Sequence, residues 1–331
     1  MSIRTWSYHS SCLLFGAAVF LAALTPIHAQ AQVARIELHT LQSTTLTDQE
    51  FLTGKKEGKP VIVPGELRIP TPGTDRLPAV VLVHGSGGVS GYVDEWAQWL
   101  NAMRVATFVF DSFTPRGIVS TVNDQSQLGR LAMIIDAYRA LERLGRHPRI
   151  DPQRIAIMGF SRGGSATLYA SLTRFQRMYG SAAGPEFAAY IVFYPDCRTT
   201  YLHDQDVAAK PIRILHGKAD DYNPVDACRL FVERLQRGGK DVQLSEYADA
   251  HHVFDWPALK TPLKLPQAQT TRRCRPEEAA DGLIINSQTR QPFTYADPCV
   301  ELGPTVAYNA KAHSEAQKAV QELVTDVLKP K

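Results

Sequence analysis

The sequence predicts an α/β fold, in which a mostly parallel sheet is covered by helices on both faces. Short apolar runs rich in valine and isoleucine, such as Leu77–Gly85, have the composition of parallel strands buried on both sides. Segments with helical periodicity lie between these runs, and strands that alternate with helices form parallel sheets. The length of 331 residues fits one large domain of this class or two small ones.

The composition and charge limit the kinds of molecule that the protein is expected to bind. A hydrophobic content of 44% is ordinary for a globular protein and allows a large core. The net charge is only +3, and no basic run reaches the density of a nucleic-acid-binding patch. We therefore expect no nucleic-acid partner.

The first 31 residues have the pattern of a signal peptide. Arg4 is their only charged residue, and the apolar run "CLLFGAAVFLAAL" follows it. Ala29 and Ala31 are small residues suited to cleavage, so we expect cleavage after Ala31 or, alternatively, after Ala29. The other interpretation is an uncleaved anchor, although the run is short for a membrane span. Residues 32–331 are then expected to form a single domain, periplasmic or secreted, that has no membrane contact after cleavage.

The expected elements follow in chain order. Residues 33–70 read as two extended segments joined by a polar stretch. A strand at 77–85, a helix at 91–103 and a strand at 105–113 come next. The helix expected at 128–145 has six apolar residues on one face. The remaining elements are a strand at 154–160, a helix at 162–174, strands at 188–195 and 211–217, a helix at 225–236, a strand at 241–247 and a final helix at 311–328.

Residues 256–306 interrupt this alternation. They are rich in proline and polar residues and include Cys274 and Cys299. We expect a disulfide-tied excursion from the domain, with a small hairpin at 282–295.

The cysteines indicate disulfides. Four remain after Cys12 leaves with the signal peptide, and an even number in an exported chain allows three pairings. We expect Cys197 to pair with Cys228, and Cys274 with Cys299. No C-x-x-C spacing is present, so neither a zinc site nor a thioredoxin-like motif is indicated.

The stretch "RIAIMGFSRGGSATLYA", residues 154–170, predicts a reactive serine. An apolar strand ends at Ser161, and a helix-like run follows directly. A sharp turn between strand and helix leaves room only for small residues two positions to either side, and these are Gly159 and Gly163. This G-x-S-x-G pattern is typical of a nucleophile elbow, although by itself it is a weak signal.

Other strand ends supply the partners that a serine nucleophile needs. "LHGKADDYNP" offers Asp220, or alternatively Asp221, to orient a histidine, and "YADAHHVF" offers His251 and His252 as the general base. "HGSGG", residues 84–88, offers backbone N–H groups for an oxyanion hole. We expect Ser86 to donate there together with the N–H of Arg162.

With these motifs the chain resembles the dienelactone hydrolase-like branch of the α/β-hydrolase superfamily, in which the triad follows the chain order Ser, Asp, His. The resemblance covers roughly residues 60–255 and the last helix. The family's A-x-H-x-F pattern matches the chain at His252, and its G-x-x-D-x-x-x-P pattern matches at Asp220. The stretches that carry it are "VVLVHGSGG", "FDSFTPRG", "GFSRGG", "LHGKADDYNP" and "AHHVF".

The resemblance implies an α/β-hydrolase fold and a hydrolase that needs no cofactor or metal. Dienelactone hydrolase itself uses a cysteine nucleophile where this chain has Ser161, so the family's substrate does not carry over. We expect small carboxylic esters to be cleaved through an acyl-enzyme. Two alternatives are a peptidase or amidase with the same triad, and a binding protein without activity. Against the second, all three triad positions are filled.

Two further expectations concern the substrate. Gly85 and Arg116 are candidates for substrate contact, although Arg116 could instead form an ion pair with Asp111 that braces its loop. Only about 15 residues separate the strand at 188–195 from the next, which is too few for a cap domain of the kind that lipases insert. We therefore expect an open, shallow site for small soluble esters, which the excursion at 256–306, beginning just after His252, could wall on one side.

Overall fold

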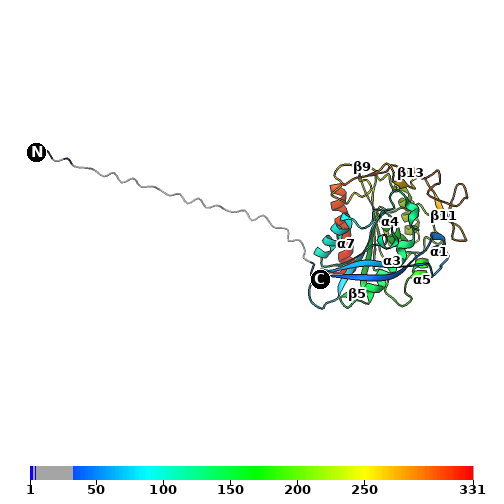
Figure 1. Cartoon of the computed structure of the whole chain (residues 1–331), viewed down its shortest axis with the longest axis horizontal. Coiled ribbons are helices and arrows are strands. Elements are labelled where there is room, and N and C mark those ends of the chain that lie inside the picture. The colour runs from blue at the N-terminus through cyan, green and yellow to red at the C-terminus, as the bar shows by residue number, and fades with distance from the viewer. Residues whose placement is uncertain (3, 5–32, 331) are drawn as a thin grey trace. The chain divides into compact units, whose positions relative to one another are not determined.

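A sheet of eight strands forms the centre of the structure, a computed structural model that describes residues 1, 2, 4 and 33–330 (Figure 1). The strand order is β1-β2-β4-β3-β5-β6-β7-β8. Neighbours from β4 to β8 are parallel, whereas β2 runs antiparallel to both β1 and β4. This confirms the mostly parallel sheet. The strands are β1 (Arg35–Thr45), β2 (Lys59–Ile69), β3 (Leu77–Val83), β4 (Ala106–Phe110), β5 (Ile150–Phe160), β6 (Tyr190–Phe193), β7 (Ile212–Gly217) and β8 (Val242–Tyr247).

The expected signal peptide, residues 1–31, lies outside the described residues apart from residues 1, 2 and 4. Residues 33–330 belong to one compact unit. Among the described residues, no helix combines the length and the apolar character needed to cross a bilayer.

Helices cover both faces of the sheet. Side chains of a strand point alternately to opposite faces, so one buried strand contributes to an apolar core on each side. Val81 and Val83 of β3 lie in one apolar core, and Val80 and Leu82 lie in the other. The first core is closed by α3, α4 and α6, and the second by α2 and α7. Figure 1 shows α7 on one side of the sheet and α3 and α4 on the other. The bounds are α1 (Asp48–Leu52), α2 (Gly91–Ala102), α3 (Ala132–Gly145), α4 (Arg162–Tyr169), α5 (Thr173–Tyr179), α6 (Asp226–Arg237) and α7 (Ala310–Leu328), with 3-10 turns at Thr114–Arg116 and Gln125–Gln127.

The helix expected at 162–174 is two helices, so that prediction is wrong. α4 ends at Tyr169, and α5 begins at Thr173. Between them the backbone pairs with a distant segment: Leu172 forms a bridge with Val207, and the N–H of Thr173 donates to the carbonyl of Asp206. These long-range bonds replace the helical ones, and local periodicity gives no sign of them.

Residues 256–306 form an excursion of short strand pairs. β10 pairs with β13, β11 with β12, and β9 with β14. The expected hairpin lies around β12, where Ile285 bridges to Pro292. The bounds are β9 (Leu263–Lys264), β10 (Gln269–Thr270), β11 (Pro276–Glu278), β12 (Ile284–Asn286), β13 (Glu301–Leu302) and β14 (Thr305–Val306).

Two disulfides link the cysteines in the expected pairs. Cys197 pairs with Cys228, which joins the loop after β6 to α6, and Cys274 pairs with Cys299 inside the excursion. The Cα atoms of each pair are 5.0 Å apart.

Candidate active site

Ser161 occupies the sharp turn between β5 and α4. Its backbone has φ 54° and ψ −114°, a conformation that non-glycine residues rarely adopt. A Cβ on Gly159 would lie 2.1 Å from the carbonyl oxygen of Gly163, and a Cβ on Gly163 would lie 2.2 Å from that of Val83. Strand and helix therefore meet this closely only with glycine at both positions, which is the geometry of a nucleophile elbow.

The structure brings Ser161, His252 and Asp220 into one hydrogen-bonded chain. Nε2 of His252 lies 2.8 Å from Oγ of Ser161, and its Nδ1 lies 2.7 Å from Oδ2 of Asp220. The other carboxylate oxygen of Asp220 accepts from the backbone N–H groups of Tyr222 and Asn223, at 2.9 and 2.8 Å. Since an ionised carboxylate only accepts, this pattern assigns the proton of a neutral His252 to Nδ1 and leaves the Nε2 lone pair facing Ser161.

The electrostatics favour an ionised Asp220. Burial alone would raise its pKa, but the charge of His252 and its hydrogen bond outweigh that penalty, so the pKa lies below its ordinary value. The neighbouring His216 also helps to lower the pKa of Asp220, while burial lowers the pKa of His216 itself. A negative carboxylate is what stabilises an imidazolium when His252 accepts a proton.

The alternatives Asp221 and His251 lie outside this chain. Asp221 accepts a hydrogen bond of 2.7 Å from the backbone N–H of Thr305 and so ties the end of the excursion to the Asp220 loop. Within residues 33–330, no hydrogen bond joins His251 to Ser161 or Asp220. The choice of His252 and Asp220 thus has a geometric basis.

The turn after β3 lies beside Ser161, as an oxyanion hole requires. A Cβ on Gly85 would lie 3.4 Å from the Cβ of Ser161. The N–H of Gly85 donates to the hydroxyl of Tyr92. In the described part of the chain, the backbone N–H groups of Ser86 and Arg162 donate to no protein acceptor, so both are free for a ligand oxygen.

Side chains hold the oxyanion loop in place. Gln125 contacts the hydroxyl of Ser86 at 3.2 Å and that of Tyr222 at 3.2 Å. The guanidinium of Arg162 donates to the carbonyls of Gln125 and Leu128, at 2.7 and 3.0 Å. Its side chain therefore anchors the 125–128 turn.

Arg116 needs a correction. Its guanidinium pairs with both oxygens of the buried Asp136, at 2.8 and 3.0 Å, and it lines neither cavity beside Ser161. Asp111, the partner considered from sequence, instead accepts from the N–H groups of Phe113 and Thr114. Substrate contact by Arg116 is therefore wrong for this structure, because a buried carboxylate already holds the side chain. Gly85 does line a cavity at Ser161.

An aromatic frame around His252 was not predicted. The ring of Tyr222 stacks on the imidazole at 4.7 Å, and the ring of Tyr194 approaches it edge-on at the same distance. The hydroxyl of Tyr194 donates to the buried Asp255, which also accepts from the indole N–H of Trp96. Tyr222 and Asp255 lie in or beside the motifs read from sequence, but nothing in the motifs indicates how their side chains point.

The site is recessed, and the expectation of a shallow site is wrong. Ser161 is only 9% exposed, and His252 only 2%. Two cavities meet at Ser161, and residues of the 256–306 excursion line both of them. The excursion covers a site that a compact domain without a cap would leave open.

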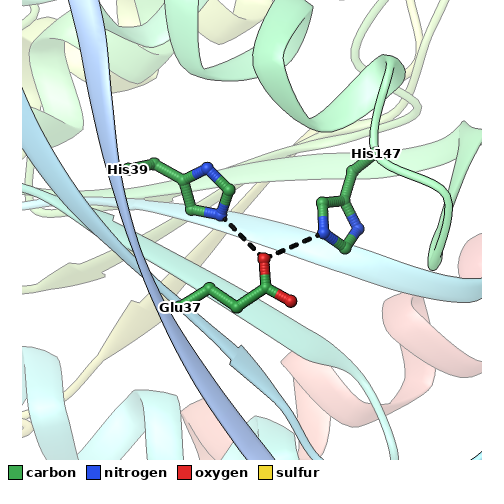
Figure 2. Close-up of side chains that lie close together, drawn as sticks. All are labelled: Glu37, His39 and His147. Atoms are coloured by element: carbon green, nitrogen blue, oxygen red, sulfur yellow. Dashed lines mark hydrogen bonds and ion pairs between the residues drawn. The ribbon is translucent and has the colours of Figure 1, made fainter.

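One cluster outside this site offers metal-ligand atoms. Glu37, His39 and His147 bring their donor atoms within 4.8 Å of one another (Figure 2). Nε2 of His147 lies 3.1 Å and Nε2 of His39 lies 3.2 Å from the same carboxylate oxygen, and only the His147 contact has hydrogen-bond geometry.

The other ring nitrogens argue against a metal there. Nδ1 of His39 accepts from the guanidinium of Arg143 at 2.9 Å, and Nδ1 of His147 accepts from the backbone N–H of Arg149 at 3.2 Å. A neutral ring that accepts at Nδ1 carries its proton at Nε2, whereas a metal at Nε2 requires that proton on Nδ1. Burial and the charge of Arg143 also lower the pKa of His39. The cluster is better described as a structural contact between β1 and the end of α3.

Comparisons with known proteins agree with this fold. A sequence profile of the dienelactone hydrolase family matches residues 66–262, more than half of the chain. A dienelactone hydrolase-like promiscuous phosphotriesterase from metagenomic libraries superposes with a TM-score of 0.54 at 17% identity, over 88% of this chain and 98% of that one. Esterase 2 of Thermogutta terrifontis, in its tabun-modified form, superposes with a TM-score of 0.56 at 14% identity, over 91% and 98%.

A search of curated protein sequences gave no significant match. At these identities the superpositions establish the fold, and the profile match establishes the family. The chain belongs to the dienelactone hydrolase family, has the α/β-hydrolase fold and is a hydrolase that acts on ester bonds.

Proposed function

We propose that this protein is a serine esterase that cleaves small carboxylic esters through an acyl-enzyme on Ser161. The observation that carries the proposal is the chain of hydrogen bonds from Asp220 through His252 to Ser161, at 2.7 and 2.8 Å. The strained turn at Ser161 and the two cavities that meet there support it.

In the acylation step, Oγ of Ser161 attacks the ester carbonyl carbon while Nε2 of His252 takes its proton. The carbonyl oxygen becomes an oxyanion, and the N–H groups of Ser86 and Arg162 donate to it. The bond to the alcohol oxygen then breaks, and His252 returns the proton to that oxygen. Asp220 stabilises the imidazolium that exists between the two proton transfers.

In the deacylation step, water replaces the alcohol. His252 takes a proton from the water as its oxygen attacks the acyl carbon. The bond to Oγ of Ser161 breaks, His252 returns the proton to Oγ, and the carboxylic acid leaves. The chain supplies every group that these steps use.

Covalent labelling tests the nucleophile. A fluorophosphonate transfers its phosphonyl group to an activated serine with loss of fluoride, and intact-mass spectrometry detects the adduct. We expect one adduct on the parent protein and none on Ser161→Ala or His252→Ala. Ser314→Ala, at an exposed position on α7, is the matched control and should label like the parent.

The proposal is wrong if the folded parent stays unlabelled, or if Ser161→Ala labels as fast as the parent. Thermal unfolding of each variant shows whether loss of labelling reflects loss of the fold. The hydrolysis of short-chain esters, with the matching anilides as amide controls, then measures the preferred bond.

We further propose that the protein is exported, with residues 1–31 as its signal peptide. The Arg4-led apolar segment and the two disulfides support this, since disulfides persist in oxidising compartments. Sequencing of the N-terminus of the exported protein should begin at Gln32, or at Gln30 for the alternative cleavage. An N-terminus at Met1 would contradict cleavage.

A further inference from the structure

The two cavities that meet at Ser161 differ in chemical character. One, about 810 Å³ including its open mouth, is walled mainly by aromatic and aliphatic side chains, among them Tyr92, Trp256, Leu259, Leu263 and Leu265. The other, about 570 Å³ on the same measure, is the more polar of the two: tyrosine rings and other apolar atoms form much of its surface, and polar groups come from residues such as Arg130, Asp196, Thr199, Gln269 and Thr271. A substrate that fills both has one apolar part and one smaller polar part.

The position of His252 indicates which cavity holds the alcohol part of the ester and which holds the acyl part. His252 must return its proton to the alcohol oxygen, so the leaving alcohol lies on the side of that ring. His252 lines the apolar cavity and is absent from the lining of the polar one. Arg162 and Ser165, in the first turn of α4, line only the polar cavity. The geometry therefore places the alcohol in the apolar cavity and the acyl group in the polar one.

Arg130 gives the polar cavity a specific requirement. Its Nη1 contacts Oδ2 of Asp196 at 3.3 Å and Oγ1 of Thr199 at 3.2 Å. Its Nη2 is buried, and among the described residues it has no hydrogen-bond partner. The rings of Phe293 and Tyr295 flank the guanidinium, at 5.2 and 5.1 Å from the ring centroids. Arg130 lines the cavity although Nη2 itself is covered, so an acyl oxygen would pair with this donor after a small movement of the side chain; leaving a buried donor unpaired costs free energy.

The excursion supplies walls to both cavities and is fixed to the site. Trp256 to Leu265 border the apolar cavity, and Gln269 to Thr271 with Tyr295 border the polar one. Arg272 donates to the backbone carbonyl of Asp221 at 2.9 Å, and the hydroxyl of Thr270 donates to the backbone carbonyl of Tyr222 at 2.6 Å. The segment at 256–306 is thus held against the loop that carries Asp220.

We propose that this site selects esters of an apolar alcohol with a compact acyl group that carries a hydrogen-bond-accepting oxygen. The selection is made by the excursion together with Arg130. This inference rests on the proposed esterase function and adds the substrate class to it.

A set of four esters tests the selection. The acyl group is methoxyacetyl or its isostere butyryl, and the alcohol is benzyl or 2-methoxyethyl. Each kcat/KM is divided by the rate of hydroxide-catalysed hydrolysis of the same ester, which removes intrinsic reactivity. We expect benzyl to exceed methoxyethyl by roughly tenfold and methoxyacetyl to exceed butyryl by several-fold.

Two variants separate the two preferences. Trp256→Ala should reduce the preference for benzyl to near unity and leave the acyl preference intact. Arg130→Met should remove the acyl preference and leave the alcohol preference intact. The controls are the exposed Leu230→Ala on α6 and the half-exposed Arg139→Met on α3, which should change neither ratio.

The outcomes distinguish the two proposals. Absence of labelling at Ser161 and of hydrolysis in all four esters contradicts the esterase function. Hydrolysis without either preference, or with both preferences reversed, overturns the inference alone. A folded Arg130→Met protein that keeps the full acyl preference also overturns it, because the donor would then have no role in selection.

Discussion

The molecule contains two groups in which a carboxylate meets histidine, and only one of them has the geometry that we propose for catalysis. In the first, Asp220 contacts Nδ1 of His252 at 2.7 Å. In the second, Glu37 contacts Nε2 of His147 at 3.1 Å (Figure 2). Both carboxylates have pKa values below their ordinary range. Charge and proximity alone therefore do not separate a catalytic group from a structural one.

The difference lies in which ring nitrogen meets the carboxylate. Asp220 accepts a hydrogen bond from Nδ1–H of His252, which leaves Nε2 as a base toward Ser161. In the second group, N–H donors occupy the Nδ1 lone pairs of both rings, so each ring carries its proton on Nε2 and no basic nitrogen remains; only Nε2 of His147 hydrogen-bonds to Glu37. The comparison shows that the tautomer, fixed by the second partner of each ring, decides whether the pair can act as a base.

The largest expected effect is on kcat, when the carboxylate of each group is replaced by an amide. Asp220→Asn should lower kcat by about 10⁴-fold, because an amide that donates to Nδ1 moves the histidine proton to Nε2. Glu37→Gln should leave kcat within about twofold, since Glu37 lines neither cavity at Ser161. Steady-state hydrolysis of one short-chain ester measures both.

Asp221→Asn is the matched control and should keep nearly full activity, because its partner is the backbone of Thr305. If Asp220→Asn kept the parent kcat while folded, or Asp221→Asn lost it, the assignment of Asp220 would be wrong.

A second effect, intermediate in size, concerns stability at acid pH. Here we expect the Asp220 group and the Glu37 group to respond to pH in the same direction. A carboxyl whose pKa is lowered in the folded state contributes stability that is complete above its ordinary pKa. That contribution is lost as the pH falls from the ordinary values, 3.8 for Asp220 and 4.5 for Glu37, through the folded values. Urea unfolding across this range should show a smaller loss of stability in Asp220→Asn and Glu37→Gln than in the parent.

Asp255 is a control for this prediction, because its pKa is shifted in the opposite direction. Burial raises its pKa, so its contribution is complete below the ordinary value and is lost as the pH rises through the folded value. The stability difference between the parent and Asp255→Asn should therefore change with pH in the opposite direction. The same slope in all three variants would contradict the assigned shifts.

The smallest expected effect concerns zinc. If this cluster bound zinc, a free zinc concentration 100 times the Kd would raise the free energy of unfolding by about 2.7 kcal/mol. That increase corresponds to several degrees in Tm. We expect zinc to shift the Tm of the parent and of His147→Ala equally, because metal binding would force two Nδ1–H groups against N–H donors. A larger shift in the parent would mean that the rings exchange tautomers and bind the ion.

The sequence predicted the triad because its members follow strand ends. Ser161 follows β5, Asp220 follows β7 and His252 closely follows β8, and parallel strands bring their carboxyl ends to one edge of the sheet. The buried strands could be found because continuous apolar runs are a local signal. The catalytic geometry was thus predictable from the order of elements along the chain.

The walls of the site could not be predicted in this way. Trp256, Thr271 and Tyr295 come from a segment without helical or strand periodicity, whose position depends on long-range bonds such as that from Arg272 to Asp221. The partner of Arg116 was misjudged for the same reason, since Asp136 lies on a different element 20 residues away. Side-chain contacts between distant segments leave no local pattern.

The order of the cysteines has a consequence for biogenesis. Each disulfide joins two cysteines that are neighbours in the order of cysteines after Cys12, across 31 and 25 residues. The two covalent loops neither nest nor overlap. If the protein is exported as we propose, a chain that enters an oxidising compartment N-terminus first presents Cys197 and Cys228 before Cys274 and Cys299, so the first bond that can form at each stage is the native one. Oxidative maturation of this protein then needs an oxidase and no disulfide reshuffling.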